Sequence, residues 1–203
     1  MKSFRFRTVL AQPVVSITLV AVNVLVFLLC NFFDVLYVQG RLDVYDIVVE
    51  KEYGRLLWSM FLHSGIPHLF NNMLLLFFMG SMIEKEVGHV QYAVLYFLSG
   101  IGGGILSLLV KYMNHDFSGS IGASGAIFGL DGVLLAMVLF SGRRMENVSP
   151  PRVLLMIAYS LYSGFVGENI DNAAHVGGLI TGFVLASMMC ILRRWKENQF
   201  QRK

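Results

Sequence analysis

Charged residues are scarce in this sequence. Asp, Glu, Lys and Arg make up 14% of its 203 residues, whereas apolar residues make up 56%, and the mean hydropathy is +0.64. Soluble domains carry about 25% charged residues. The shortage of charge therefore excludes an ordinary water-soluble domain, and it predicts that the chain lies mainly in a lipid bilayer.

Two further absences narrow the possible chemistry. The sequence has no H-E-x-x-H motif, and His63, His89 and His115 are scattered through predicted loops and helix ends. A metalloprotease or a haem protein built on these histidines is therefore disfavoured. The cysteines Cys30 and Cys190 lie near the exit ends of an odd and an even predicted span, so they face opposite sides of the membrane and cannot form a disulfide.

Most of the chain consists of long runs without charged residues. A helix crosses a hydrocarbon core of about 30 Å in about 20 residues, and most of the runs are this long. We therefore predict an all-α, polytopic membrane protein with six spans and a long external loop at 34–67. The predicted spans are about residues 12–33, 68–84, 90–110, 122–140, 152–166 and 172–192.

The first predicted span resembles a signal peptide, and the fifth is shorter than the others. The first is too long for a signal peptide and no small-x-small cleavage site follows it, so we expect a retained helix. The fifth starts at Pro150-Pro151 and is short for a full crossing. A short, loosely anchored helix is a candidate moving part.

Positive charge is distributed unevenly over the two sides that the spans define. The side that holds both termini carries 12 of the 16 Lys and Arg residues, and the other side carries four. The positive-inside rule then predicts both termini in the cytoplasm. We also expect a bacterial-type plasma (inner) membrane, with the active site opening to the outer side. The basic residues on the cytoplasmic side orient the spans and contact anionic head groups, and they account for the net charge of +3. No nucleic-acid partner is therefore expected.

Four polar residues that are far apart in the sequence come to one depth in this topology. The second, fourth and sixth spans all run from outside to inside, so their first turns lie level with one another. His68 and Asn72 share one face at the start of the second span, Ser124 opens the fourth, and His175 opens the sixth. We expect these residues to form a site just below the outer surface.

The four residues have the chemistry of a serine hydrolase. A serine hydroxyl attacks a carbonyl when a base removes its proton, and a neutral imidazole can do so near pH 7. Ser124 is thus the predicted nucleophile and His175 the predicted general base. The tetrahedral intermediate needs donors for its oxygen, and His68, the Asn72 amide and the backbone N–H of Ser124 are available.

Each motif also has a structural explanation. Glycine and serine are common where transmembrane helices touch, so the G-x-S-G motif around Ser124 is weak on its own. A single histidine at a helix end is more often an interfacial residue. The Gly178-x-x-x-Gly182 spacing predicts a close approach of two helix backbones, which would bring His175 to Ser124.

In combination the motifs resemble those of the rhomboid intramembrane serine proteases. The resemblance extends over nearly the whole chain. It rests on His68-x-x-x-Asn72, Gly80-x-x-x-Glu84, Gly122-Ala-Ser124-Gly and Ala174-His175-x-x-Gly178-x-x-x-Gly182.

The resemblance implies one rhomboid-type membrane domain over residues 1–203, built as a six-helix bundle with an aqueous cavity that opens outward. It implies a Ser-His endopeptidase, without a catalytic acid, metal or organic cofactor, that cuts membrane-protein substrates in or near their transmembrane segments. The oxyanion hole would use His68, Asn72 and Ser124. Phe128 would stack on the base, and the fifth span with the 163–171 loop would form the gate.

The sequence departs from the family pattern at Gly54-Arg55 and at Asp131, and Asp171 could be read as a third member of a catalytic triad. Gly54-Arg55 stands where many members carry Trp-Arg, so we expect another anchor for the first loop, through Trp58. Asp131 lies about 10 Å deeper than the predicted nucleophile, too far to orient the base, and we expect a neutral acid bonded to a neighbouring helix. Asp171 precedes the base by one turn, and we predict a helix N-cap rather than a triad member.

Two other classes of protein remain as alternatives. A rhomboid-like pseudoprotease would bind transmembrane clients without cutting them, but such a protein would be expected to lack the Ser or the His, and both are present. A transporter would usually carry buried charges on several spans, whereas Asp131 stands nearly alone. The sequence does not reveal the oligomeric state.

Overall fold

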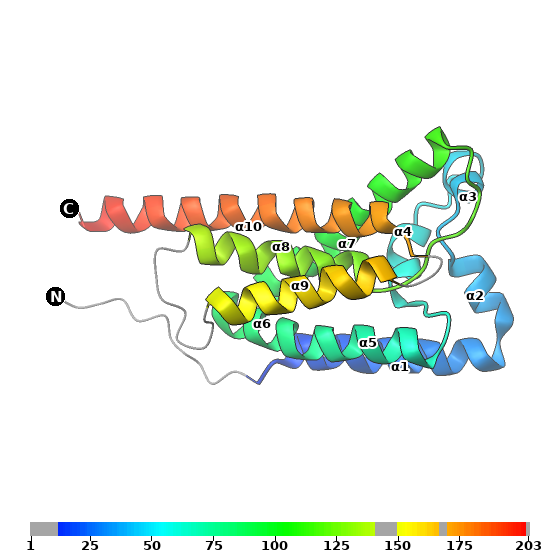
Figure 1. Cartoon of the computed structure of the whole chain (residues 1–203), viewed down its shortest axis with the longest axis horizontal. Coiled ribbons are helices and arrows are strands. Elements are labelled where there is room, and N and C mark those ends of the chain that lie inside the picture. The colour runs from blue at the N-terminus through cyan, green and yellow to red at the C-terminus, as the bar shows by residue number, and fades with distance from the viewer. Residues whose placement is uncertain (1–11, 141–149, 167–169, 202–203) are drawn as a thin grey trace.

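The computed structural model describes residues 12–140, 150–166 and 170–201, and Figure 1 shows them as a bundle of helices. The predicted all-α fold is confirmed over these ranges, in which one antiparallel bridge joins Leu42 to Ser120. Two short helical turns, η1 (Ser59–Phe61) and η2 (Leu76–Gly80), connect longer elements. The helices are α1 (Val14–Phe32), α2 (Asp34–Gly40), α3 (Val44–Val48), α4 (Arg55–Trp58), α5 (Ile66–Leu75), α6 (Ser81–Val87), α7 (His89–Met113), α8 (Ser124–Phe140), α9 (Pro150–Val166) and α10 (Asn172–Gln201).

Among the described residues, four helical stretches are long and apolar enough to cross a membrane. They are α1, the continuous stretch Ile66–Val87, α7 and the Asn172–Lys196 part of α10. Helices α8 and α9 have 17 residues each. The polytopic membrane fold is therefore confirmed, whereas the count of six spans stays a prediction.

Local sequence explains where several of these helices begin and end. Gly88 has a φ of 91°, in the left-handed region that glycine tolerates, and it separates α6 from α7. Pro67 lies in the first turn of α5, where a missing backbone N–H costs no intrahelical hydrogen bond. The predicted spans start and end close to the helix bounds, except that α10 continues to Gln201.

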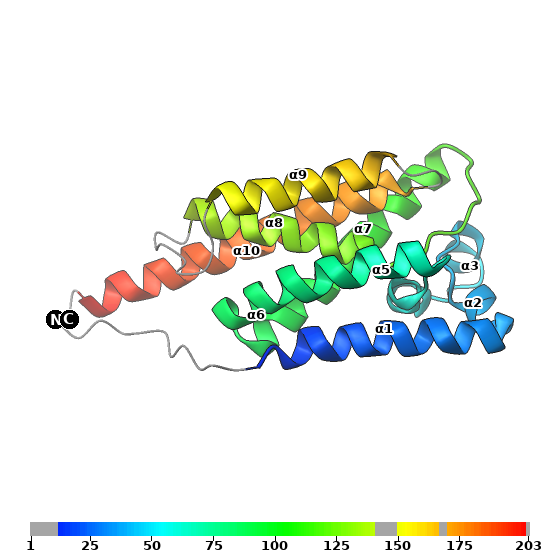
Figure 2. The same ribbon diagram turned by 60° about the horizontal axis from the view of Figure 1, so that its bottom comes forward.

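Helix α8 is the centre of the bundle. Its residues from Gly125 to Leu134 are all buried, and α7 and α10 pack along it (Figure 2). Helix α1 lies at the edge beside α5, and apolar side chains such as Leu25 and Leu28 are about half exposed on its outer face. A helix that presents so much apolar surface outward is suited to lipid rather than to water.

Helices α5, α8 and α10 all begin at the same end of the bundle (Figure 1). The short helices α2, α3 and α4 of the first loop lie at this end (Figure 1). The first turn of α1 and the last turns of α10 lie at the opposite end (Figure 2). The three helix starts that carry the predicted site therefore meet at one end of the molecule, as the sequence analysis expects.

Glycine residues allow α10 to approach α8 closely. A Cβ atom on Gly178 would overlap the carbonyl oxygen of Gly125, and one on Gly182 would overlap the carbonyl oxygen of Gly129. Only a residue without a side chain permits such a contact between backbones. The structure thus contains the close helix contact that the Gly178-x-x-x-Gly182 spacing predicts.

Two side chains anchor the first loop. The indole of Trp58 donates a hydrogen bond to the carbonyl of Leu36 at 3.2 Å, as expected for an anchor at this position. The guanidinium of Arg55 forms salt bridges with Asp46 at 2.9 Å and with Glu52 at 2.6 Å. Arg55 also donates to two backbone carbonyls of the loop, so it is a second anchor beside Trp58.

Some predictions concern residues outside the described ranges. The basic residues of segment 1–11, Arg143 and Arg144 contribute to the charge bias, and residues 167–169 belong to the predicted gate.

Both cysteines are free thiols, in agreement with the expectation that they form no disulfide.

Candidate active site

Two helix starts bring Ser124 and His175 together. Ser124 is the first residue of α8, and His175 lies in the first turn of α10. The Nε2 atom of the His175 ring lies 2.9 Å from the Oγ atom of Ser124, which is a hydrogen-bond distance. This geometry allows the imidazole to take the hydroxyl proton.

A stacked aromatic ring holds the imidazole. Phe128 follows Ser124 by one turn of α8, and its ring lies parallel to that of His175, with a centroid distance of 4.0 Å and an interplanar angle of 5°. The His175 residue is only 7% exposed. The stack fixes the plane of the imidazole while its edge faces the serine, as the family resemblance implies for Phe128.

Asp171 makes no hydrogen bond to the imidazole among the described contacts. Its Oδ1 atom accepts a hydrogen bond of 2.9 Å from the backbone N–H of Ala174, which is the N-cap contact that the sequence predicts. Its Oδ2 atom accepts hydrogen bonds from the hydroxyls of Ser107 and Ser120. No sequence pattern singles out these two serines, because only the folded loop before α8 brings Ser120 to the start of α10.

His68 faces the site through its Nε2 atom. Its Nδ1 atom lies 3.1 Å from the Ser64 hydroxyl and 3.5 Å from the Ser64 backbone N–H. Since an N–H group can only donate, this contact favours the tautomer that carries its proton on Nε2. On the Nε2 side the backbone of Gly122 comes so close that a Cβ atom there would lie 2.9 Å from Nε2. Gly122 thus leaves room for the ring, and its φ of 124° also favours glycine.

Asn72 supplies a buried amide without a hydrogen-bond partner. The residue is 5% exposed, and its Nδ2 group donates to no other group in the part of the chain that the structure describes. Buried polar groups nearly always have a partner, so this amide is available to donate to a group that enters the site.

One cavity joins these groups. It has a volume of about 1040 Å³, and its lining includes Ser124, His175, His68 and Asn72. The four residues that the sequence analysis selects therefore lie around a common space. Such a volume accommodates a peptide segment of a few residues.

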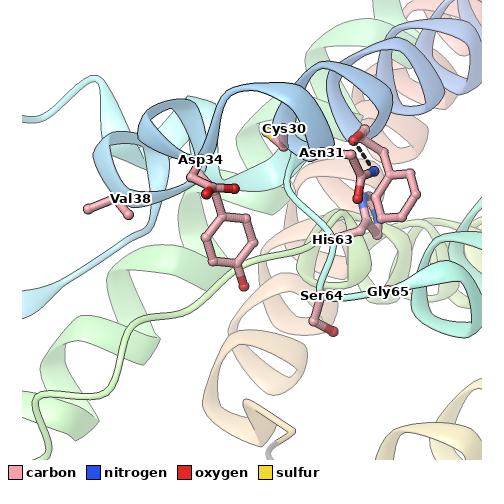
Figure 3. Close-up of a pocket in the computed structure, with 9 residues that line it drawn as sticks. Cys30, Asn31, Asp34, Val38, His63, Ser64 and Gly65 are labelled. Atoms are coloured by element: carbon pink, nitrogen blue, oxygen red, sulfur yellow. Dashed lines mark hydrogen bonds between the residues drawn. The ribbon is translucent and has the colours of Figure 1, made fainter.

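A smaller cavity of about 290 Å³ lies beside the first, between the end of α1 and residues 63–65 (Figure 3). Ser64 lines both cavities. His63 is 4% exposed, its Nδ1 atom lies 3.3 Å from the carbonyl oxygen of Phe61, and its ring packs against that of His68. Burial, with a smaller effect from His68, lowers the pKa of His63 to about 3, so this ring is neutral at pH 7.

Asp131 lies away from the nucleophile, inside the bundle. It is 1% exposed on α8, and its carboxyl group lies close to the hydroxyl of Ser160 on α9. Neither carboxyl oxygen has a hydrogen-bond partner within hydrogen-bond geometry among the described residues, so the bonded, neutral acid stays a prediction, with α9 as the neighbouring helix.

Comparison with known proteins identifies the family. Residues 50–192 match the model of the rhomboid domain, and the chain belongs to the rhomboid family. It is 40% identical to RHOMBOID-like protein 4 of Arabidopsis thaliana over 158 residues, which are 77% of this chain and 39% of that protein. It is 35% identical to Rhomboid protease GluP of Bacillus subtilis (strain 168) over 144 residues, which are 71% of this chain and 27% of that protein.

A shorter relative is covered more fully. The chain is 33% identical to Putative rhomboid protease YdcA of Bacillus subtilis (strain 168) over 153 residues, which are 75% of this chain and 74% of that protein. The chain spans about two fifths of the length of RHOMBOID-like protein 4. The resemblance drawn from the motifs is confirmed, and the chain is an integral membrane protein of this family.

Proposed function

We propose that this chain is an intramembrane serine endopeptidase with Ser124 as the nucleophile and His175 as the general base. The observation that carries the proposal is the 2.9 Å contact between Ser124 Oγ and His175 Nε2 at the wall of a cavity. Two relatives, GluP and YdcA, carry the name of a rhomboid protease or putative rhomboid protease, which supports the same reaction here.

In the first half of the reaction, Ser124 Oγ attacks the carbonyl carbon of the scissile peptide bond while His175 takes the hydroxyl proton. The imidazolium then gives this proton to the nitrogen of the leaving amine, and an acyl-enzyme forms. The parallel ring of Phe128, 4.0 Å from that of His175, keeps the imidazole in place during both transfers.

The negative oxygen of the tetrahedral intermediate needs donors at fixed positions. The Nε2–H group of His68, the Nδ2 group of Asn72 and the backbone N–H of Ser124 fill this role in our proposal. The orphaned donor of Asn72 supports it, because the intermediate would supply the missing partner.

In the second half of the reaction, water in the cavity replaces the leaving amine. His175 takes a proton from this water as the water oxygen attacks the acyl carbon, and the imidazolium then returns the proton to Ser124 Oγ as the ester bond breaks. Among the described contacts no carboxylate hydrogen-bonds the imidazole, and Asp171 is engaged elsewhere, which supports a dyad rather than a triad. The proposed reaction uses no metal or organic cofactor.

Membrane proteins with a single transmembrane segment are the substrates in this proposal, cut in or near that segment. Helix α9 packs on α8 over fewer residues than α10 does, which supports α9, whose last turn includes residues 163–166, as the route of entry. The charge bias supports cytoplasmic termini, with the cavity open to the outer side. A bacterial-type inner membrane is part of the proposal.

The test is a cleavage assay in liposomes. The purified chain is reconstituted with a panel of single-span membrane proteins, and cleavage is followed by electrophoresis and mass spectrometry. We expect the wild type to cut at least one substrate, and Ser124→Ala and His175→Ala to cut none. Cleavage by Ser124→Ala at the wild-type rate would refute the assignment.

A further inference from the structure

We propose that Asp171 is a positioning residue of this site: through Ser107 and Ser120 its carboxylate fixes the loop before the nucleophile to the helix that carries the base. The inference rests on the proposed function of Ser124 and His175. It gives Asp171 a role beyond that of a helix cap.

The cluster around Asp171 joins three separate parts of the chain. Ser107 belongs to α7 and is fully buried, Ser120 belongs to the loop before α8, and Asp171 directly precedes α10. Both hydroxyls donate to the Oδ2 atom of Asp171, and the two hydroxyl oxygens lie 3.2 Å apart. One carboxylate oxygen is therefore the meeting point of α7, the loop and α10.

An N-cap alone does not require these contacts. The cap uses only Oδ1, which accepts from the backbone N–H of Ala174, and serine, threonine or asparagine would cap the helix as well. The second oxygen is the one that binds the two serines. Hydrogen bonds to a charged acceptor are roughly twice as strong as those between neutral groups, so aspartate suits this second role.

The loop that Asp171 holds leads directly to the nucleophile. Ser120 precedes Ser124 by four residues. On its other side the loop is tied to the first external loop, by the paired backbone hydrogen bonds of Ser120 with Leu42 and by the 2.9 Å bond from the N–H of Gly122 to the carbonyl of Ser59. Among the hydrogen bonds of the described residues, the contact with Asp171 is the one that links this loop to the start of α10.

This link bears on the distance between the reacting atoms. His175 follows Asp171 by one helical turn, and its backbone N–H donates to the Asp171 carbonyl at 3.2 Å. When the link is lost, the start of α8 can shift relative to α10, and a shift of about 1 Å between reacting groups can cost about 10²-fold in rate. In this proposal the Asp171 cluster therefore keeps Ser124 Oγ at 2.9 Å from His175 Nε2.

The first test compares two serines of the same loop. Ser120→Ala removes the hydroxyl that reaches Asp171, and Ser120→Thr keeps a hydroxyl. Ser118→Ala is the matched control, because the Ser118 hydroxyl accepts a 2.7 Å hydrogen bond from Lys111 instead. Saturation kinetics with a fluorophosphonate give the maximal labelling rate and the half-saturating concentration, and thermal unfolding in detergent gives the melting temperature.

We expect Ser120→Ala to lower the maximal labelling rate about tenfold, with little change in the half-saturating concentration or the melting temperature. Ser120→Thr should restore most of the rate, and Ser118→Ala should label as the wild type does. A wild-type rate in Ser120→Ala would overturn the proposal. So would a loss of rate that is matched by a loss of thermal stability, because the cluster would then be merely structural.

A double-mutant cycle provides the second test. Asp171→Ser retains a helix cap but is too short to hold both hydroxyls. If Asp171 acts through Ser120, the double variant should label no more slowly than the slower single variant, because contacting residues are not additive. Additive losses would contradict the proposal. Failure of the proposed function is distinguishable, since the wild type itself would then remain unlabelled at Ser124.

Discussion

Replacing Gly178 by alanine tests whether contact between helix backbones sets the active-site geometry. A Cβ atom at this position would overlap the carbonyl oxygen of Gly125, which is a backbone atom of α8 and cannot rotate away. Helices α8 and α10 must therefore separate locally by about 1 Å or more to reach an ordinary van der Waals distance.

The expected cost follows from this overlap. Overpacking of a buried site costs about 1–3 kcal/mol, and for a chain of about 200 residues 1 kcal/mol lowers the melting temperature by about 2–4 °C. Gly178 follows His175 by three residues, and Gly125 follows Ser124 directly. A separation there also lengthens the 2.9 Å contact of the dyad, so we expect the labelling rate to fall at least tenfold.

Gly125→Ala is the matched control on the facing helix. A Cβ atom on Gly125 would lie 3.5 Å from the nearest atom, the carbonyl oxygen of Ala174, which is an ordinary contact. Alanine is also a better helix former than glycine by about 0.8–1 kcal/mol. Thermal unfolding should therefore show a lower melting temperature for Gly178→Ala and an unchanged or higher one for Gly125→Ala. Equal melting temperatures in the two variants would refute the packing argument.

Three further predictions concern buried polar groups. Asn72→Ala should lower the rate of substrate cleavage about 10²-fold without loss of thermal stability, because an oxyanion donor is lost; an unchanged rate would remove Asn72 from the site. The pKa of His63, about 3 in the fold, lies below the value of 6.5 in the unfolded chain, so protonating His63 in the fold is unfavourable. The free energy of unfolding is therefore highest above about pH 6.5 and is about 2 kcal/mol lower at pH 5. The melting temperature should therefore drop between pH 7 and pH 5, and drop less in His63→Gln; equal drops would contradict the argument. Asp131→Asn should keep wild-type labelling, since Asp131 does not line the cavity that holds the dyad, and a loss of labelling in a stably folded variant would make Asp131 functional.

The sequence predicts best the depth and the direction of the long helices, because both follow from the positions of the charged residues. The uncharged runs predict the long helices, and the alternation of direction brings the starts of three of them to one level. The side chains that meet there, Ser124, His175, His68 and Asn72, line one cavity. This inference needs no knowledge of side-chain packing, because residues in the first turns of parallel helices share a depth in the bilayer.

Loop contacts could not be predicted in the same way. Ser120 lies in a segment without periodicity, so its hydrogen bond to Asp171 depends on a fold that only tertiary contacts define. The same holds for Arg55, whose salt bridge partners include Asp46, nine residues earlier in the first loop. For Asp171 the sequence predicted the local contact, the N-cap, but not the contacts with distant serines.

The most direct measurement is the mapping of a fluorophosphonate adduct. Purified wild type, Ser124→Ala, His175→Ala and Ser118→Ala are incubated with the reagent, digested and sequenced by mass spectrometry. The dyad predicts one adduct, on the Oγ atom of Ser124, which is retained in Ser118→Ala and lost when either Ser124 or His175 is replaced. An adduct on another serine, or labelling that survives Ser124→Ala, would contradict it.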